Sequence, residues 1–515
     1  MRVGHWLFWS LAGVGLGACG SSSDDAGADG GAGDAGTAPA AFDDTHGGAL
    51  PAIEGPVRGG NGSPWVQSTS IDLGALGYRT DEYFLSGTAR SYAAVGELGE
   101  DGDWQLEADG SAAYRTRIVV YRPRDEADFN GSVMVEWLNV SGGLDTAPDW
   151  TSGHTELIRA GWAWVGVSAQ STGIEGGGAN TGFGGLGDLS LKGFDAERYG
   201  TLDHPGDEFS YDMFSQVGRV LTEGGDGEVD PLGGLSPQRL IAAGESQSAF
   251  RLVTHINGVD PLVPIYDGFL VHSRGGDAAP LGAQAGLDAD ATVRIRSDVR
   301  VPVLTFQTET DILDLSSINS RQDDSERLRL WEVPGTAHAD LYSLWAGTTD
   351  AGDDPSMADV VVTNEPIPGI VMCDEPINAG PQHFVLNAAI AALDAWVRDG
   401  TPPPMADRID VEGEPPMLSV DAHGNVTGGI RTPHTDVPTA VLSGTGQTPG
   451  GFCGLFGTTV AFDADKLASL YADRDDYATR VAAAADEAVA AGFLLESDAD
   501  LIRRAAEMTT LFDAP

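Results

Sequence analysis

The chain of 515 residues is strongly acidic, since 77 Asp and Glu residues stand against 29 Lys and Arg residues and give a formal net charge of −48. Such a surface repels the phosphates of DNA and RNA, so the composition excludes a nucleic-acid-binding protein. The length exceeds the ~150 residues of a typical domain and is sufficient for a large hydrophobic core. We interpret the acidity as a property that favours solubility.

The N-terminus carries the pattern of an export signal. Residues 1–18 are predicted to be a signal peptide, because Arg2 is followed by an apolar run, Trp6 to Ala18, that is too short to span a membrane. The run ends in Leu16-Gly17-Ala18-Cys19, which resembles a bacterial lipobox and makes Cys19 the expected lipidation site; a plain signal peptide is the alternative. Residues 19–60, rich in Gly, Ala and Asp, predict a disordered tether. The expectation is an exported protein that meets a membrane only through its lipid anchor, at the outer membrane or cell surface of a Gram-negative host.

Apolar runs and helical patterns alternate along most of the chain. Residues 75–122 are β-rich, and after them strands are expected at 133–138, 162–167, 239–243, 268–271, 301–307 and 328–333, with helices at 152–160, 211–222 and 382–398. This order predicts an α/β fold with a mostly parallel central sheet flanked by helices. The Gly-rich stretch 171–208 is expected to be a lid-like insertion. Residues 61–400 would form the core, and 401–515 a C-terminal helical extension packed on it.

A strand, a tight turn of small residues and a helix start follow one another at 241–250. The turn, Gly244-Glu245-Ser246-Gln247-Ser248, resembles a nucleophile elbow, in which a sharp bend exposes a serine hydroxyl; Ser248 stands where a glycine is usual. A hydroxyl attacks well only when a base removes its proton and an acid orients that base. Ser246 is therefore the candidate nucleophile.

The base and the acid are expected at the ends of later strands. Strand 328–333 leads into Gly335-Thr336-Ala337-His338, so His338 is the candidate base, and strand 301–307 leads into Asp311, the candidate acid, with Glu309 as its competitor. All three reactive residues then lie at carboxyl ends of strands, where open α/β sheets place their sites. His272 precedes both candidate acids, which is the wrong chain order for the base.

The negative oxygen of a tetrahedral intermediate needs two hydrogen-bond donors. One is expected to be the backbone N–H of Gln247, directly after the serine. The second is expected from the loop after strand 133–138, where either Val140 or Ser141 could donate because nearby glycines let the backbone turn inward.

The remaining cysteines indicate a disulfide, and the sequence lacks the common metal and dinucleotide motifs. Cys373 and Cys453 form an even pair in an exported protein and are expected to form a disulfide, with two buried thiols as the alternative. We find neither a cluster of metal-ligand residues nor a dinucleotide-binding glycine motif, so the sequence predicts no metal and no cofactor.

The elbow, Asp311 and the segment that ends in His338 resemble the α/β-hydrolase superfamily. Residues 423–434 and 455–457 are similar to segments of a bacterial family of alpha/beta hydrolase domain proteins, and the resemblance covers about 75–510. It implies an α/β-hydrolase fold in which the C-terminal segment belongs to the hydrolase unit. The predicted function is a serine hydrolase that cleaves a small-molecule or polymeric carboxylic ester through an acyl-enzyme. An amidase or peptidase with the same residues, or a surface lipoprotein that only binds a ligand, are the alternatives.

Overall fold

The computed structural model describes residues 49–177, 187–224, 229–282, 292–367, 370–448 and 452–513. The predicted signal peptide, the expected lipidation site at Cys19 and most of the predicted tether lie outside these residues, as does the middle of the 171–208 stretch. Among the helices in these ranges, none combines the length and the apolar character needed to cross a bilayer.

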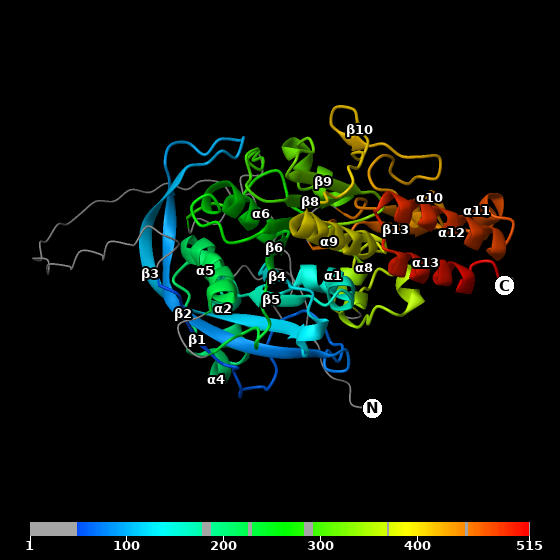
Figure 1. Ribbon diagram of the computed structural model, residues 1–515. Helices are drawn as coiled ribbons and strands as arrows, with labels where there is room; N and C mark the ends of the chain where they lie inside the picture. Colours follow the sequence, from blue (N-terminus) through cyan, green and yellow to red (C-terminus); the bar gives the residue numbers. More distant parts are fainter. Residues whose placement is uncertain are drawn as a thin grey trace, which may run out of the picture.

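A nine-stranded sheet forms the centre of the molecule (Figure 1). Its strands are β1 (Ala52–Glu54), β2 (Tyr78–Ala94), β3 (Leu106–Pro123), β4 (Ser132–Trp137), β5 (Ala163–Val167), β6 (Arg239–Glu245), β7 (Gly268–His272), β8 (Val303–Thr308) and β9 (Leu328–Val333). They lie in the order β1-β2-β3-β5-β4-β6-β7-β8-β9. Strands β1 to β3 are antiparallel, β3 runs antiparallel to β5, and all pairs from β5 to β9 are parallel.

Helices cover both faces of the parallel part of the sheet. Helices α1 (Pro148–Arg159) and α9 (Gln382–Asp399) pack on one face, and α5 (Ser210–Glu223) and α6 (Gln247–Thr254) pack on the other. Side chains of β4 alternate between these two cores, with Val133 and Val135 in one and Met134 in the other, as the two-residue period of a strand requires. The predicted α/β fold with a mostly parallel sheet is confirmed.

Shorter elements fill the connections. They are η1 (Glu126–Asp128), α2 (Ser171–Glu175), α3 (Leu191–Phe194), α4 (Ala196–Tyr199), η2 (Asp207–Phe209), the π-helical turn η3 (His255–Val259), α7 (Glu309–Leu313), η4 (Ser317–Ser320), α8 (Leu341–Leu344), η5 (Ala346–Thr348) and η6 (Pro355–Ala358). Within the 171–208 stretch, the described helices α2 to α4 pack on β2, where Arg198 forms an ion pair of 2.6 Å with buried Glu82. These described parts of the expected lid are therefore built into the body of the protein.

Helix α1 begins four residues before its predicted start at Ser152. The carboxylate of buried Glu136, at the end of β4, accepts the backbone N–H groups of Asp149 and Trp150 at 2.9 Å each. Pro148 occupies the first turn, where its missing N–H costs nothing. A side chain from a neighbouring strand thus satisfies the first turn of α1, and this tertiary contact extends the helix beyond its local sequence pattern.

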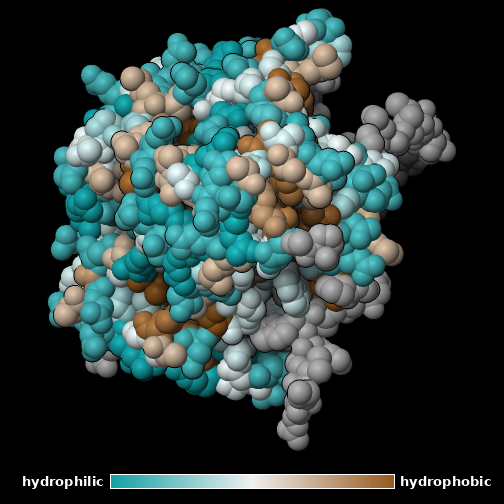
Figure 2. All heavy atoms as spheres, turned by 90° about the vertical axis from the view of Figure 1, so that its right-hand side faces the viewer, coloured by the Kyte–Doolittle hydropathy of each residue, from teal (hydrophilic) through white to brown (hydrophobic). Residues whose placement is uncertain are grey.

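The C-terminal residues contain small strands and helices. These are β10 (Val411–Glu412), β11 (Met417–Leu418), α10 (Pro433–Asp436), β12 (Ala440–Ser443), η7 (Phe452–Leu455), β13 (Thr458–Ala461), α11 (Ala464–Leu470), α12 (Arg474–Ala491) and α13 (Glu496–Met508). They lie at the end of the molecule opposite the β2–β3 hairpin (Figure 1), where Arg159 of α1 pairs with Asp498 of α13 at 3.0 Å. The surface on this side is largely hydrophilic (Figure 2), in keeping with the acidic composition.

Candidate active site

The turn between β6 and α6 presents Ser246 in a strained conformation. Ser246 has φ 54° and ψ −120°, a backbone region that side chains other than glycine rarely adopt. A Cβ at Gly244 would lie 3.0–3.1 Å from atoms of Ser248 and Leu252. The close packing of β6 against α6 therefore favours glycine at 244 and a small residue at 248. The bend leaves Gln247 as the first residue of α6.

Three side chains from separate strand ends form a hydrogen-bonded chain. Ser246 Oγ lies 2.8 Å from His338 Nε2, and His338 Nδ1 lies 2.7 Å from Asp311 Oδ1. The other oxygen of Asp311 accepts the Thr308 N–H at 2.7 Å, and the His338 N–H donates to Thr310 Oγ1 at 3.1 Å. The structure therefore brings together the three residues predicted from the sequence. Hydrogen bonds that involve backbone N–H groups also hold Asp311 and His338 in position.

Glu309, the competing acid, has a different set of partners. Its carboxylate accepts the backbone N–H of Gly335 at 2.6 Å and that of Gly444 at 2.7 Å. Burial raises the pKa of Glu309 to about 7, although these hydrogen bonds act in the opposite direction. Glu309 thus links the loop that leads to His338 with the C-terminal residues beside β12, while Asp311 is the carboxylate that contacts the imidazole.

A second carboxyl group, which the sequence reasoning missed, lies beside the imidazole. Glu245 Oε1 is 3.3 Å from His338 Nε2, and Asn139 Nδ2 donates to Glu245 Oε2 at 3.3 Å. Burial raises the pKa of Glu245 to about 7, against the attraction of His338 and His272. Burial acts to lower the pKa of His338. The negative charges of Glu245 and Asp311 and the hydrogen bond to Asp311 act more strongly in the opposite direction, so the pKa of His338 is raised. The available signal was a charged residue at the end of an apolar strand, directly before the candidate serine.

The loop after β4 faces the start of α6. The Val140 N–H donates over a long 3.3 Å contact to the side-chain oxygen of Gln247. The Ser141 N–H donates instead to Asn139 Oδ1 at 2.8 Å, within the same loop. Of the two predicted donors, Val140 is therefore the one whose N–H is directed at the nucleophile turn.

A pocket opens beside the imidazole of His338. Glu245, His272 and His338 line it, together with residues of the β4–α1 loop, α1, α8 and α9. His272, which ends β7, is buried; its Nδ1 lies 2.9 Å from Asp149 Oδ1 and its Nε2 lies 3.1 Å from Gln382 Nε2. His272 thus lines the pocket and is paired with Asp149, which gives a second histidine–aspartate pair near the one at Ser246.

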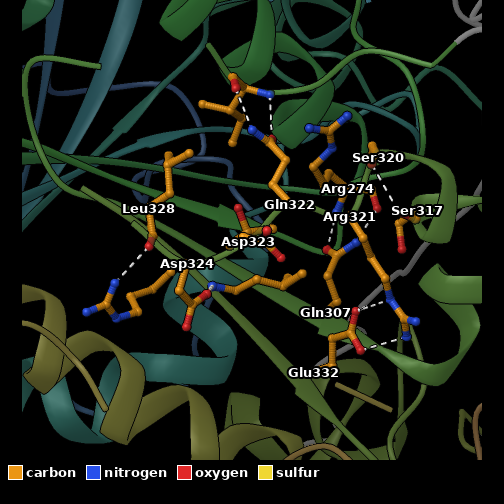
Figure 3. Close-up of a pocket in the computed structure, with 14 residues that line it drawn as sticks. Arg274, Gln307, Ser317, Ser320, Arg321, Gln322, Asp323, Asp324, Leu328 and Glu332 are labelled. Carbon is orange, nitrogen blue, oxygen red and sulfur yellow. Dashed lines mark hydrogen bonds and ion pairs between the residues drawn. The ribbon is translucent and has the colours of Figure 1, made fainter. Parts of the chain in front are cut away.

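A different pocket lies against β8 and β9 (Figure 3). Arg321 binds both oxygens of Glu332 at 2.7 and 2.8 Å, and burial lowers the pKa of Arg274 to about 10. The Arg274 guanidinium donates to backbone carbonyls, including that of Gly275 at 2.8 Å. These polar groups are used in structural contacts. Within the described ranges, no group of three or more His, Cys, Asp or Glu residues is placed to hold a metal ion.

The predicted disulfide is confirmed. Cys373 and Cys453 are bonded, with their Cα atoms 5.6 Å apart. Cys453 belongs to η7, and the carbonyl of Leu455 in the same turn accepts the N–H of Ala339 at 3.1 Å. Because Ala339 follows His338, the disulfide lies close to a contact that holds the histidine loop.

Residues 53–504 match the family described as alpha/beta hydrolase domain, and the chain belongs to that family. This confirms the resemblance found in the sequence. No curated protein matches the chain.

Several solved structures are similar to part of the chain. Esterase Est22 is 11% identical, with a TM-score of 0.27 over 49% of this chain and 70% of its own. A fungal esterase of Rhizomucor miehei is 12% identical, with a TM-score of 0.26 over 53% and 85%. An alpha-beta serine hydrolase homologue from Coxiella burnetii is 12% identical, with a TM-score of 0.27 over 46% and 86%. At these identities and TM-scores, the matches carry no argument about activity.

Proposed function

We propose that the protein is a serine hydrolase that cleaves carboxylic esters through an acyl-enzyme. The observation that carries this proposal is the chain of short contacts from Ser246 Oγ to His338 Nε2, at 2.8 Å, and from His338 Nδ1 to Asp311, at 2.7 Å. With its Nδ1 proton directed at Asp311, the imidazole can accept the serine proton at Nε2. The strained φ of 54° at Ser246 supports the same role, because strain of this kind is common at functional sites.

The expected reaction has two halves. Ser246 Oγ attacks the ester carbonyl while His338 takes its proton, and His338 then returns that proton to the departing alcohol. Water, deprotonated by the same imidazole, releases the acyl group from Ser246. We assign the stabilisation of the negative oxygen to the N–H groups of Gln247 and Val140, since the N–H of Ser141 is held by Asn139. When an ester binds, the Gln247 side chain must release its 3.3 Å contact to Val140.

The test compares the full chain with two serine variants. Ser246→Ala should lower kcat for 4-nitrophenyl acetate about 10⁴-fold or more, because the nucleophile is lost. Ser248→Ala is the matched control: its hydroxyl is buried and has no hydrogen-bond partner in the part of the chain that the structure describes, so its removal should leave the rate within about twofold. A fluorophosphonate probe should label the wild type and the control but not Ser246→Ala.

Two results would contradict the proposal. Equal rates for Ser246→Ala and the wild type would show that Ser246 is not the nucleophile, and the absence of labelling in folded wild type would favour a protein that only binds a ligand. A matched pair of ester and anilide substrates with the same acyl group separates an esterase from an amidase, and we expect the ester to react faster.

A further inference from the structure

One residue of the C-terminal segment lies between the two loops that carry Asp311 and His338. Gly444, which directly follows β12, is buried. Its N–H donates to the carboxylate of Glu309 at 2.7 Å, and its carbonyl oxygen accepts the hydroxyl of Thr310 at 2.6 Å. Both hydrogen-bonding groups of the Gly444 backbone are therefore bound to the two residues that precede Asp311.

Each of these two hydrogen bonds continues to the histidine loop. The other oxygen of the Glu309 carboxylate accepts the N–H of Gly335 at 2.6 Å. The hydroxyl of Thr310, which can donate and accept at the same time, donates to Gly444 and accepts the N–H of His338 at 3.1 Å. Two hydrogen-bonded bridges thus connect Gly444 with the loop that holds the imidazole, and the side chains of Glu309 and Thr310 in them are fully buried.

The space around Gly444 is also restricted. A Cβ there would lie 2.5 Å from the backbone nitrogen of Thr310 and 2.6 Å from the carbonyl oxygen of Thr336. These are backbone atoms of the two loops, because Asp311 directly follows Thr310 and His338 lies two residues after Thr336. The φ of Gly444 lies outside the left-handed region, so an alanine at this position would test the contact and not the backbone conformation.

We propose, on the basis of the proposed ester hydrolysis, that Thr310 and Gly444 are positioning residues that hold His338 between Asp311 and Ser246, so that the C-terminal segment contributes to the active site. The Thr310 hydroxyl holds the main chain of His338, and Gly444 in turn holds that hydroxyl. Both residues act through the imidazole. The effect on rate is expected to be large, because a misplacement of about 1 Å at reacting groups can cost about 100-fold.

The first test compares Thr310→Val with Thr310→Ser in the full chain. Valine has nearly the same shape but loses both hydrogen bonds, so kcat for 4-nitrophenyl acetate should fall about 10- to 100-fold while KM stays within about twofold. Serine keeps the hydroxyl and should restore kcat to within about threefold of the wild type. Thr254→Val is the matched control, because the hydroxyl of buried Thr254 donates to the carbonyls of Phe250 and Ala279 instead, and its kcat should stay within about twofold.

Gly444→Ala tests the second positioning residue. Its Cβ should push apart the loops that carry Asp311 and His338, and kcat should fall about 100-fold. Gly218→Ala in α5 is the matched control, because a Cβ there would lie 2.5 Å from the side chain of Ile265 and would affect packing alone. Its kcat should stay within about twofold of the wild type.

Proton NMR separates positioning from a general loss of stability. The proton between His338 Nδ1 and Asp311 Oδ1, which are 2.7 Å apart, should give a strongly downfield signal in the wild type, in Thr310→Ser and in both controls. The signal should move upfield or disappear in Thr310→Val and Gly444→Ala. A wild-type signal in Thr310→Val, or an equal loss of activity in Thr310→Ser and Thr310→Val, would overturn the inference. A wild type without Ser246-dependent hydrolysis would refute the proposed function, and the NMR signal, which does not depend on turnover, would then decide the positioning role by itself.

Discussion

Removal of the disulfide should destabilise the fold by an amount that follows from its position in the chain. The bond joins Cys373 and Cys453 across a sequence separation of 80 residues. Closing a loop of that length removes about 4–5 kcal/mol of conformational entropy from the unfolded chain. With an unfolding entropy of about 2.1 cal/mol/K per residue, the double variant Cys373→Ser/Cys453→Ser should melt about 4–5 °C below the wild type.

The same variant should also lose activity to a smaller extent. The η7 turn that contains Cys453 supplies the carbonyl of Leu455 to the N–H of Ala339, next to His338. If the free energy of this one hydrogen bond is lost from the positioning of His338, kcat/KM for an activated ester should fall about 2- to 10-fold.

Thermal unfolding followed by circular dichroism, together with ester hydrolysis, measures both effects. Wild type treated with a reductant should match the double variant, and the double variant should not respond to the reductant. A melting temperature within 1 °C of the wild type would refute the entropy argument. A lower melting temperature with unchanged kcat/KM would refute the link between the disulfide and the histidine loop.

Two further predictions concern the groups around the imidazole. Asp311→Asn should lower kcat for 4-nitrophenyl acetate about 10³- to 10⁴-fold, because an amide favours the wrong tautomer of His338; a loss below tenfold would mean that Asp311 does not orient the base. Glu245→Gln should move the acid limb of the kcat/KM profile to lower pH. The carboxylate of Glu245 raises the pKa of His338, so its removal leaves the base unprotonated at lower pH. A limb that stays in place or moves upward would contradict this electrostatic coupling.

Local sequence pattern was sufficient to predict the parallel part of the sheet. Each of these strands is a short apolar run bounded by turn residues, and the alternation with helices restricts the topology to few choices. The carboxyl ends of parallel strands meet at one edge, so the chain order of Ser246, Asp311 and His338 was enough to group them. The strand order reverses at the neighbouring strands β4 and β6, and open sheets bind ligands at the carboxyl ends of the strands at such a switch point.

Features that depend on contacts between distant segments could not be predicted. The start of α1 depends on Glu136 of a neighbouring strand, and the choice between the two donors after β4 depends on where the Asn139 side chain points. His272 was set aside because of its chain order, although the structure links it to Asp149 and Gln382, which are 123 and 110 residues away in sequence. Hydrophobic periodicity contains no information about such polar networks.

The link made by Glu309 has a consequence for the biosynthesis of the protein. Translation has completed all six parallel strands, Ser246 and Asp311 when residue 333 emerges from the ribosome, and His338 follows a few residues later. The N–H of Gly444 is one of the donors that satisfy the buried carboxylate of Glu309, so the loop before His338 lacks part of its support until more than a hundred further residues have been made. The nascent chain would therefore carry the three proposed catalytic residues well before this support is complete, and the proposed activity should appear late in synthesis.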